Sequence, residues 1–270
     1  MTAVPERRVR VRSRFRAGAW IRFAALVVLT VVLLAPLLST FVRVLTPGER
    51  GGGVLAQLAG AFTYGPVLTW LGNSLMVTAA TVVVTVLVSA PAGYVLSRGR
   101  GRGVSVFALV IFGLQSLPII LFLVPLFVLF ALVGLVDNLL GLGIIYIGMG
   151  IAVATWTMAA AFDSIPVDLE EASWLDGCSV FGGYWRIVLP NALPGVLSAA
   201  IFTFLLAWND YWIALVFILS NANYTMGIGL AASYGSPLLS LIGLVPPLVV
   251  FLVLHRFFSL GGVSGSLAGT

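Results

Sequence analysis

The densest group of charged side chains in this chain lies in one short segment, residues 163–186. Five of the nine acidic residues fall here: Asp163, Asp168, Glu170, Glu171 and Asp176. An ordinary solvated loop between two apolar stretches would explain the acids, but it would not need Trp174 and Trp185. Such aromatic side chains favour contact with a protein partner or with a membrane interface. The segment therefore predicts a water-exposed surface on which another protein docks.

The residue types that are missing exclude several kinds of site. All 14 basic residues are arginine, so the chain has no lysine for a Walker A phosphate loop or for a Schiff base. A single cysteine, Cys178, and a single histidine, His255, exclude an internal disulfide and argue against a Cys/His metal site. Ser264 and His255 are a conceivable hydrolase pair, but no nucleophile–base–orienter set is visible near them. We expect no catalytic residue and no metal site in this chain.

A second polar group interrupts the apolar sequence at residues 208–211. Trp208, Asn209, Asp210 and Tyr211 combine aromatic faces with hydrogen-bonding groups, a combination that suits sugars. A charge at mid-bilayer costs about 2.5–3.5 kcal/mol, so Asp210 is expected to face a polar cavity or an interface. Asn73 and Gln115 are further candidates for a substrate path. Alternatively, the aromatic residues form an interfacial belt and the polar pair serves helix packing.

Secondary-structure elements must hold these two polar groups in position, and the composition of the chain indicates that these elements are membrane helices. Hydrophobic residues make up 60% of the chain and charged residues 9%, which is typical of an integral membrane protein. A span needs about 20 mostly apolar residues. The sequence predicts an all-α fold with six spans at about residues 23–42, 73–96, 103–136, 139–162, 194–219 and 237–254. The first could also be a signal peptide, but it is long for one and no cleavage site follows.

The arginines predict the orientation of these spans. Half of them lie in the first 22 residues, and with six spans Arg98, Arg100, Arg102, Arg186 and Arg256 fall on that same side. Only Arg43 and Arg50 fall on the other side. By the positive-inside rule, both termini and the acidic segment are expected in the cytoplasm, and the basic cluster marks topology rather than nucleic-acid binding. The predicted domains are a basic tail (1–20), a transmembrane domain (21–260) and a glycine-rich tail (261–270).

Within the transmembrane domain, residues 164–190 are expected to form two short helices joined by a hinge. Pro166 suits the start of the first helix, and the acids that follow complement its dipole. Gly177 is placed to end that helix in a left-handed conformation, and Ser179 can cap the second.

The same residues resemble a known family. Glu171-Ala172-Ser173, Gly177, Ile187, Leu189 and Pro190 are similar to the "EAA" motif of permeases from ABC importers. Other stretches resemble carbohydrate-uptake permeases related to the maltose transporter: residues 73–75, 92–98, 125–126, 134–135 and 208–211, and the tail at 256–258 with Gly261, Gly265 and Gly269. The chain departs from the motif at Ser173 and Cys178, where the family has alanine, and residues 46–70 match poorly.

The resemblance implies a permease subunit of a sugar importer that works by alternating access. The predicted ATPase-coupling residues are Asp168, Glu170, Glu171, Ala172, Ser173, Asp176, Gly177, Ile187, Leu189 and Pro190. ATP and Mg would bind to two partner ATPase subunits, with no cofactor in this chain. A second permease, an extracytoplasmic solute-binding protein and the lipid of a bacterial cell membrane complete the expected partners. The alternatives are a permease for another solute (polyamine, phosphate or glycerol phosphate), an ATP-independent secondary transporter, or a membrane scaffold.

Overall fold

The computed structural model describes residues 16–46, 53–233 and 236–258, and every regular element in these ranges is a helix. Four helices are long and apolar enough to cross a membrane: α1 (Arg16–Leu45), α3 (Val67–Arg98), α6 (Leu139–Asp163) and α13 (Pro237–Phe258). Two bent helix pairs would raise the number of spans to as many as six. The chain is therefore an all-helical membrane protein with four to six candidate spans. The predicted C-terminal tail, 261–270, and most of the N-terminal tail, 1–20, lie outside the described residues.

The chain divides into two compact units, residues 1–55 and residues 56–270. In the first unit, α1 exposes apolar side chains along most of its length, which suits a helix that faces lipid. The second unit contains the remaining candidate spans and both groups of polar residues singled out above.

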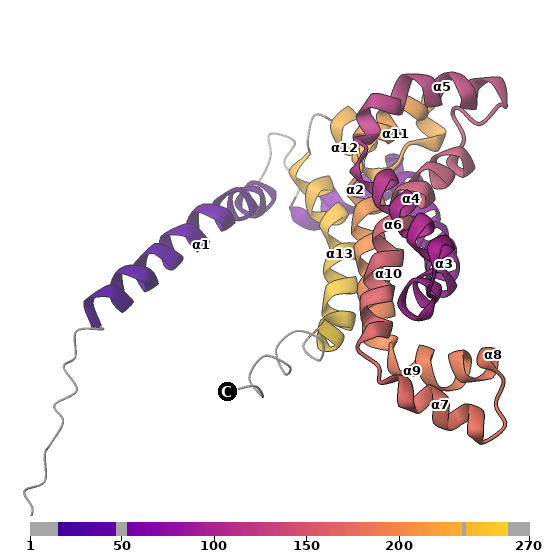
Figure 1. Cartoon of the computed structure of the whole chain (residues 1–270). Helices are drawn as coiled ribbons and strands as arrows, with labels where there is room; N and C mark the ends of the chain where they lie inside the picture. Colours follow the sequence, from indigo (N-terminus) through magenta and orange to yellow (C-terminus); the bar gives the residue numbers. More distant parts are fainter. Residues whose placement is uncertain (1–15, 47–52, 234–235, 259–270) are drawn as a thin grey trace, which may run out of the picture. The chain divides into compact units, whose positions relative to one another are not determined.

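Three helices form the centre of the second unit. Helices α3, α6 and α10 (Leu193–Trp208) pack against one another, and α13 packs against α10 (Figure 1). The face of α3 that meets α6 consists of small residues, among them Thr81, Thr85 and Ser89, all fully buried. At Gly93 an added Cβ would lie 2.9 Å from the Met158 Cβ, so only glycine permits this approach. Small residues at such contacts let membrane helices pack closely without a hydrophobic driving force.

The third predicted span is broken at Pro118. Helix α4 (Arg102–Ser116) ends there, and a 3₁₀ turn, η1 (Ile119–Phe122), leads into α5 (Leu123–Leu132), bent by 83° from α4. Leu117 adopts an extended conformation because the proline ring that follows disfavours the helical one. Pro125 lies in the first turn of α5, where it is tolerated.

The fifth predicted span, over residues 194–219, is not one continuous helix. Helix α10 ends at Trp208, and a separate helix, α11 (Trp212–Phe217), follows. The Asp210 carboxylate accepts hydrogen bonds from the backbone N–H groups of Ile213 and Ala214, at 3.4 and 3.0 Å, and so starts the new helix. The region 46–70, predicted as a loop, also differs: it contains α2 (Val54–Tyr64) and the first turn of α3.

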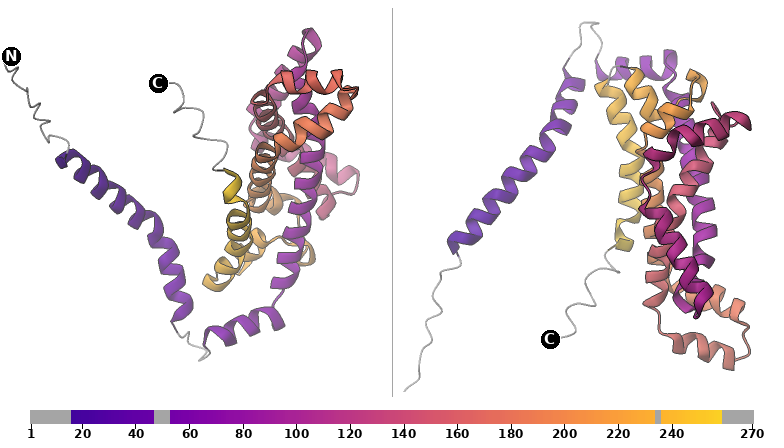
Figure 2. Two further views of the ribbon diagram at one scale, coloured as in Figure 1. Left: turned by 90° about the horizontal axis from the view of Figure 1, so that it is seen from below. Right: turned by 45° about the horizontal axis from the view of Figure 1, so that its top comes forward.

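The polar segments gather at the two ends of this helix group. At one end lie the elements of the acidic segment: α7 (Val167–Leu175), α8 (Val180–Gly183), the π-helical turn η2 (Tyr184–Val188) and α9 (Leu189–Asn191). At the opposite end lie α11 and α12 (Met226–Ala232), joined through the 3₁₀ turn η3 (Asn221–Asn223) (Figures 1 and 2). Arg98 pairs with Glu170 of α7, which agrees with the prediction that Arg98 and the acidic segment lie on the same side of the membrane.

Candidate functional site

The acidic segment folds as two short helical stretches around a glycine. Helix α7 begins after Pro166, ends at Leu175, and is followed by Gly177 with a φ of +88°. This left-handed conformation favours glycine and lets the backbone reverse. The Ser179 hydroxyl then accepts a hydrogen bond of 3.1 Å from the Gly182 N–H and caps α8.

The two stretches pack closely at a second glycine. The Ser173 hydroxyl donates to the Glu170 carbonyl at 2.7 Å and is buried between them. A Cβ added to Gly183 would lie 3.0 Å from the Ser173 Oγ and 3.2 Å from the Trp174 Nε1. Gly183 thus holds α8 against α7, a role that the sequence did not indicate.

Glu170 joins this segment to the central helices. Its side chain is only 1% exposed, yet its carboxylate accepts a 2.7 Å hydrogen bond from the Arg98 Nε and a 2.8 Å bond from the Tyr94 hydroxyl. The Arg98 Nη2 also donates to the Ile165 carbonyl at 2.8 Å. A buried carboxylate needs such partners because unpaired burial of a charge is very costly.

A second contact between helix ends supports the first. The Ser97 hydroxyl donates to the Asp163 carboxylate at 2.6 Å, which links the end of α3 to the end of α6. Arg98 donates to the same hydroxyl at 3.1 Å. Sequence reasoning placed Glu170 in the coupling group but missed Tyr94, Ser97, Arg98 and Asp163 as its support. Arg98, a charge at the end of a long apolar helix and four residues after Tyr94, was the available signal.

The side of the segment that points away from the helices is apolar and exposed. Leu175 is 89% exposed and Phe181 is 71% exposed, and Trp174 and Trp185 are partly exposed beside them. The other predicted coupling acids, Asp168, Glu171 and Asp176, are also exposed, as is Ala172. We call Leu175, Phe181, Trp174 and Trp185 the exposed tip. Exposed aromatic and aliphatic groups rimmed by charges are typical of a protein-binding surface.

The remaining residues of the predicted coupling group lie nearer the helices. Ile187 and Leu189 are half-buried, Pro190 is exposed, and Val188 between them is fully buried. They form the connection from η2 through α9 into α10.

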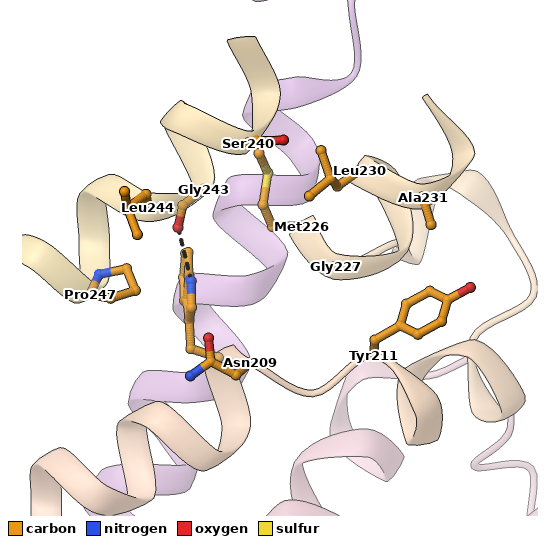
Figure 3. Close-up of a pocket in the computed structure, with 11 residues that line it drawn as sticks. Asn209, Tyr211, Met226, Gly227, Leu230, Ala231, Ser240, Gly243, Leu244 and Pro247 are labelled. Carbon is orange, nitrogen blue, oxygen red and sulfur yellow. Dashed lines mark hydrogen bonds between the residues drawn. The ribbon is translucent and has the colours of Figure 1, made fainter. Parts of the chain in front are cut away.

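At the other end, three of the four residues at 208–211 line one cavity of about 690 Å³. Its walls come from α10, α12 and α13 and from the break before α11: Trp208, Asn209, Tyr211, Met226, Gly227, Leu230, Ala231, Ser240, Gly243, Leu244 and Pro247 (Figure 3). Ligand sites commonly have volumes of about 300–1,000 Å³. We call this space the α10–α13 cavity.

Trp208 closes one side of the cavity through a hydrogen bond to α13. Its indole N–H donates to the Gly243 carbonyl at 3.1 Å, the dashed line in Figure 3. That carbonyl would normally accept from the residue four positions later, but this residue is Pro247, which has no N–H. The indole therefore satisfies a carbonyl that the proline leaves free.

The other predicted path residues lie elsewhere. The Asp210 carboxylate accepts from the Tyr146 hydroxyl at 2.8 Å and caps α11, so it is turned away from the cavity lining. Asn73 donates to the carbonyls of Ala222 and Tyr224. Gln115 lines a different, mainly apolar cavity of about 540 Å³ between α4, α5 and α6. The structure thus brings Trp208, Asn209 and Tyr211 together and separates Asp210, Asn73 and Gln115 from them.

Asp137 holds the loops at this end together. It has a φ of +54°, and one carboxylate oxygen accepts from the Leu219 N–H, the Ser220 N–H and hydroxyl, and the Asn223 amide. Burial alone would raise the pKa of this carboxyl, but the hydrogen bonds outweigh it and hold the pKa below its usual value.

Metal binding finds no support in the part of the chain that the structure describes. No group of three or more His, Cys, Asp or Glu side chains in these ranges could hold a metal ion. The acids of the segment are either paired, as Glu170 is, or spread over the surface.

Comparison with known proteins identifies the relatives of this chain. Residues 89–263 match the family described as "Binding-protein-dependent transport system inner membrane component". The sulfoquinovosyl glycerol transport system permease protein SmoH of Agrobacterium fabrum is 30% identical over 80% of this chain and 78% of its own length. The maltodextrin transport system permease protein MdxG of Bacillus subtilis is 28% identical over 90% of this chain and 94% of its own.

A solved structure shares the fold. A chain from a bacterial ABC transporter that imports the acidic polysaccharide alginate matches with a TM-score of 0.78, covering 93% of this chain and 100% of the other. The two sequences are 20% identical, so this match concerns the fold alone.

Proposed function

This chain belongs to the family of binding-protein-dependent transport system inner membrane components, and from that premise we propose that it is the permease subunit of an ATP-driven sugar importer. It is a transport subunit of a bacterial membrane and not itself an enzyme. Family membership implies a partner permease, an ATPase and a substrate-binding protein. Sugar as the solute is supported by relatives named for maltodextrin and trehalose transport.

One observation carries the coupling part of the proposal. The acidic segment has an apolar exposed tip on one side and a buried ion pair, Glu170 with Arg98, on the other. A partner that grips the tip would move α7, and the ion pair would pass that movement to α3. A rigid-body tilt of the central helices would then switch the path from inward-open to outward-open.

The proposed assembly has two permease chains, unlike each other, above two ATPase subunits. ATP and Mg would bind to the ATPase subunits, since this chain has no lysine for a phosphate loop. Both termini and the exposed tip would lie in the cytoplasm, as the arginine distribution favours. The α10–α13 cavity would form part of the sugar path.

A permease for phosphate or another anionic solute is disfavoured because the second unit has basic residues only at its α7 end and near its C-terminus. An ATP-independent secondary transporter would have no use for the exposed tip. A purely structural scaffold would show no solute-dependent activity.

The test is whether the tip holds the ATPase. The full importer would be purified through a tag on this chain, and the retained ATPase subunits would be measured. Leu175→Asp together with Phe181→Asp should remove them, because each places a charge in an apolar contact, whereas Leu175→Met should retain them. Membrane insertion should be equal in all three proteins. Full retention of the ATPase by the double Asp variant would overturn the docking assignment.

A further inference from the structure

We propose that the α10–α13 cavity accepts an uncharged sugar and discriminates against acidic ones. This inference rests on the proposed function and adds the charge class of the solute. The relatives leave that class open, because their names include both a maltodextrin permease and a transporter of an acidic polysaccharide. The charges of this chain are more informative.

The cavity lining contains no charged side chain. Its polar groups are the Asn209 amide, the Tyr211 and Ser240 hydroxyls, and backbone groups (Figure 3). The Ser240 hydroxyl donates to the Ser236 carbonyl at 3.0 Å and so offers lone pairs inward. Hydroxyl and amide groups of this kind exchange hydrogen bonds with sugar hydroxyls as donor or acceptor.

The aromatic residues complete a surface suited to a neutral ring. The Trp208 N–H is already used by the Gly243 carbonyl, and its ring stacks on Phe204 with centroids 5.7 Å apart. What Trp208 can offer a ligand is therefore apolar ring surface, and the ring of Tyr211 lines another part of the same cavity. Such surfaces pack on the C–H faces of a sugar and contribute no charge.

No arginine, lysine or histidine lines the cavity to pair with an acidic sugar. Residues 51–97, 103–185 and 187–254 contain no arginine, lysine or histidine. Arg98 ends α3 and pairs with Glu170 of α7, Arg100 and Arg102 follow it up to the start of α4, and Arg186 lies in η2. The α7 end lies opposite α11 and α12 (Figure 1). A carboxylate moved from water into this cavity would lose hydration without gaining a counter-charge, which is strongly unfavourable.

The charges that the second unit carries at its α11–α12 end are negative. Asp210 lies between the lining residues Asn209 and Tyr211 in the sequence, and Asp137 holds the neighbouring loops. Hydrogen bonds keep the pKa of Asp137 below its usual value, so it is ionised at neutral pH. The Asp137 carboxylate would repel an anionic sugar and leave a neutral one unaffected.

The test measures direct binding to the purified importer without its solute-binding protein, so that selection by that protein does not intervene. The probes are two mixtures of matched length: neutral glucose oligosaccharides and uronic acid oligosaccharides. We expect binding of the neutral mixture, at least about tenfold tighter than that of the acidic one. Equal or tighter binding of the acidic mixture overturns the inference, and so does binding of neither.

A substitution tests the cause of the discrimination. Leu230→Arg places a cation in the lining and should raise the affinity for uronates relative to neutral sugars by about tenfold. Leu230→Gln adds polarity without charge and should leave the ratio unchanged. An unchanged ratio in Leu230→Arg would also overturn the inference. Stimulation of the importer's ATPase by its solute-binding protein tests the proposed function separately, because that readout does not depend on the charge of the sugar.

Discussion

The Arg98 Nε lies 2.7 Å from the Glu170 Oε1, and this ion pair joins the last turn of α3 to the helix that precedes Gly177. The contact spans 72 residues of sequence. It involves Glu170 rather than its neighbour Glu171, which is exposed in the motif position. Within the motif region, one acid faces the central helices and the next faces outward.

The first prediction concerns this pair. Glu170→Gln leaves Arg98 partly buried without a counter-charge, and loss of one partner of a buried pair typically costs about 3–5 kcal/mol. We expect a lower melting temperature of the purified importer and loss of coupled transport. Glu171→Gln, one residue away and exposed, should leave the melting temperature unchanged.

A charge swap separates coupling from simple damage. Arg98→Glu with Glu170→Arg keeps a pair of opposite charges between α3 and α7 and should recover part of the transport lost in either single variant. If the swap restores the melting temperature but no transport, the pair has a structural role only.

The second prediction concerns the contact between α3 and α6. Gly93→Ala should destabilise the protein, because the new Cβ would lie about 3 Å from backbone atoms of Thr155 and Ala159, which cannot move aside. Gly113→Ala is the matched control, since α4 has open space at that position. The control should be neutral or stabilising by up to about 1 kcal/mol, as expected for alanine within a helix. The melting temperature of each variant is measured from the fraction of protein that stays monodisperse on heating. Equal changes in melting temperature for Gly93→Ala and Gly113→Ala would contradict the close packing at Gly93.

The third prediction is a pH dependence. Because the pKa of Asp137 in the folded protein lies below its unfolded value of about 3.9, the unfolded state binds the proton more readily. The stabilisation from Asp137 is therefore fully present above about pH 4 and is lost as the pH falls through the folded pKa. Asp137→Asn should lower the melting temperature at pH 7. The difference in melting temperature between the variant and wild type should shrink as the pH falls towards 3. A constant difference across that range would rule out the carboxylate as the cause.

The fourth prediction tests the bond between Trp208 and Gly243. Trp208→Phe removes the indole N–H that donates to the Gly243 carbonyl, which should cost about 1–3 kcal/mol. Pro247→Ala supplies a backbone N–H four residues after that carbonyl, so it should recover stability in the Trp208→Phe background. Chemical denaturation of the four proteins of this double-mutant cycle gives the interaction energy. Strictly additive effects would mean that the two residues do not share this carbonyl.

Local features of the fold were predictable where one residue type has a strong conformational preference. Gly177 was expected in the left-handed region and has a φ of +88°, and Ser179 was expected to cap the helix that follows it. The extended conformation of Leu117 follows from the proline after it, although the 83° bend at the break between α4 and α5 does not. Sequence periodicity does not report the angle between two helices.

Contacts between distant residues could not be predicted in the same way. Asp210 was singled out because a charge within an apolar segment is energetically costly. Its hydrogen bonds to the first turn of α11, however, depend on the break after Trp208. The partners of Glu170 lie on α3, and a sequence pattern alone does not say which helix ends meet. The cavity that joins Asn209 to Ser240 likewise arises only when α10 and α13 pack together.

The most direct test of this account is sugar uptake by the reconstituted importer. Liposomes containing the full complex, with ATP on the side of the ATPase and the solute-binding protein with labelled sugar on the other, should accumulate the sugar. Accumulation should stop without ATP, and it should also stop in the Leu175→Asp, Phe181→Asp variant despite equal insertion. Accumulation that continues at the same rate without ATP, or with the tip variant, would contradict the claim that this chain is moved by an ATPase through its exposed tip.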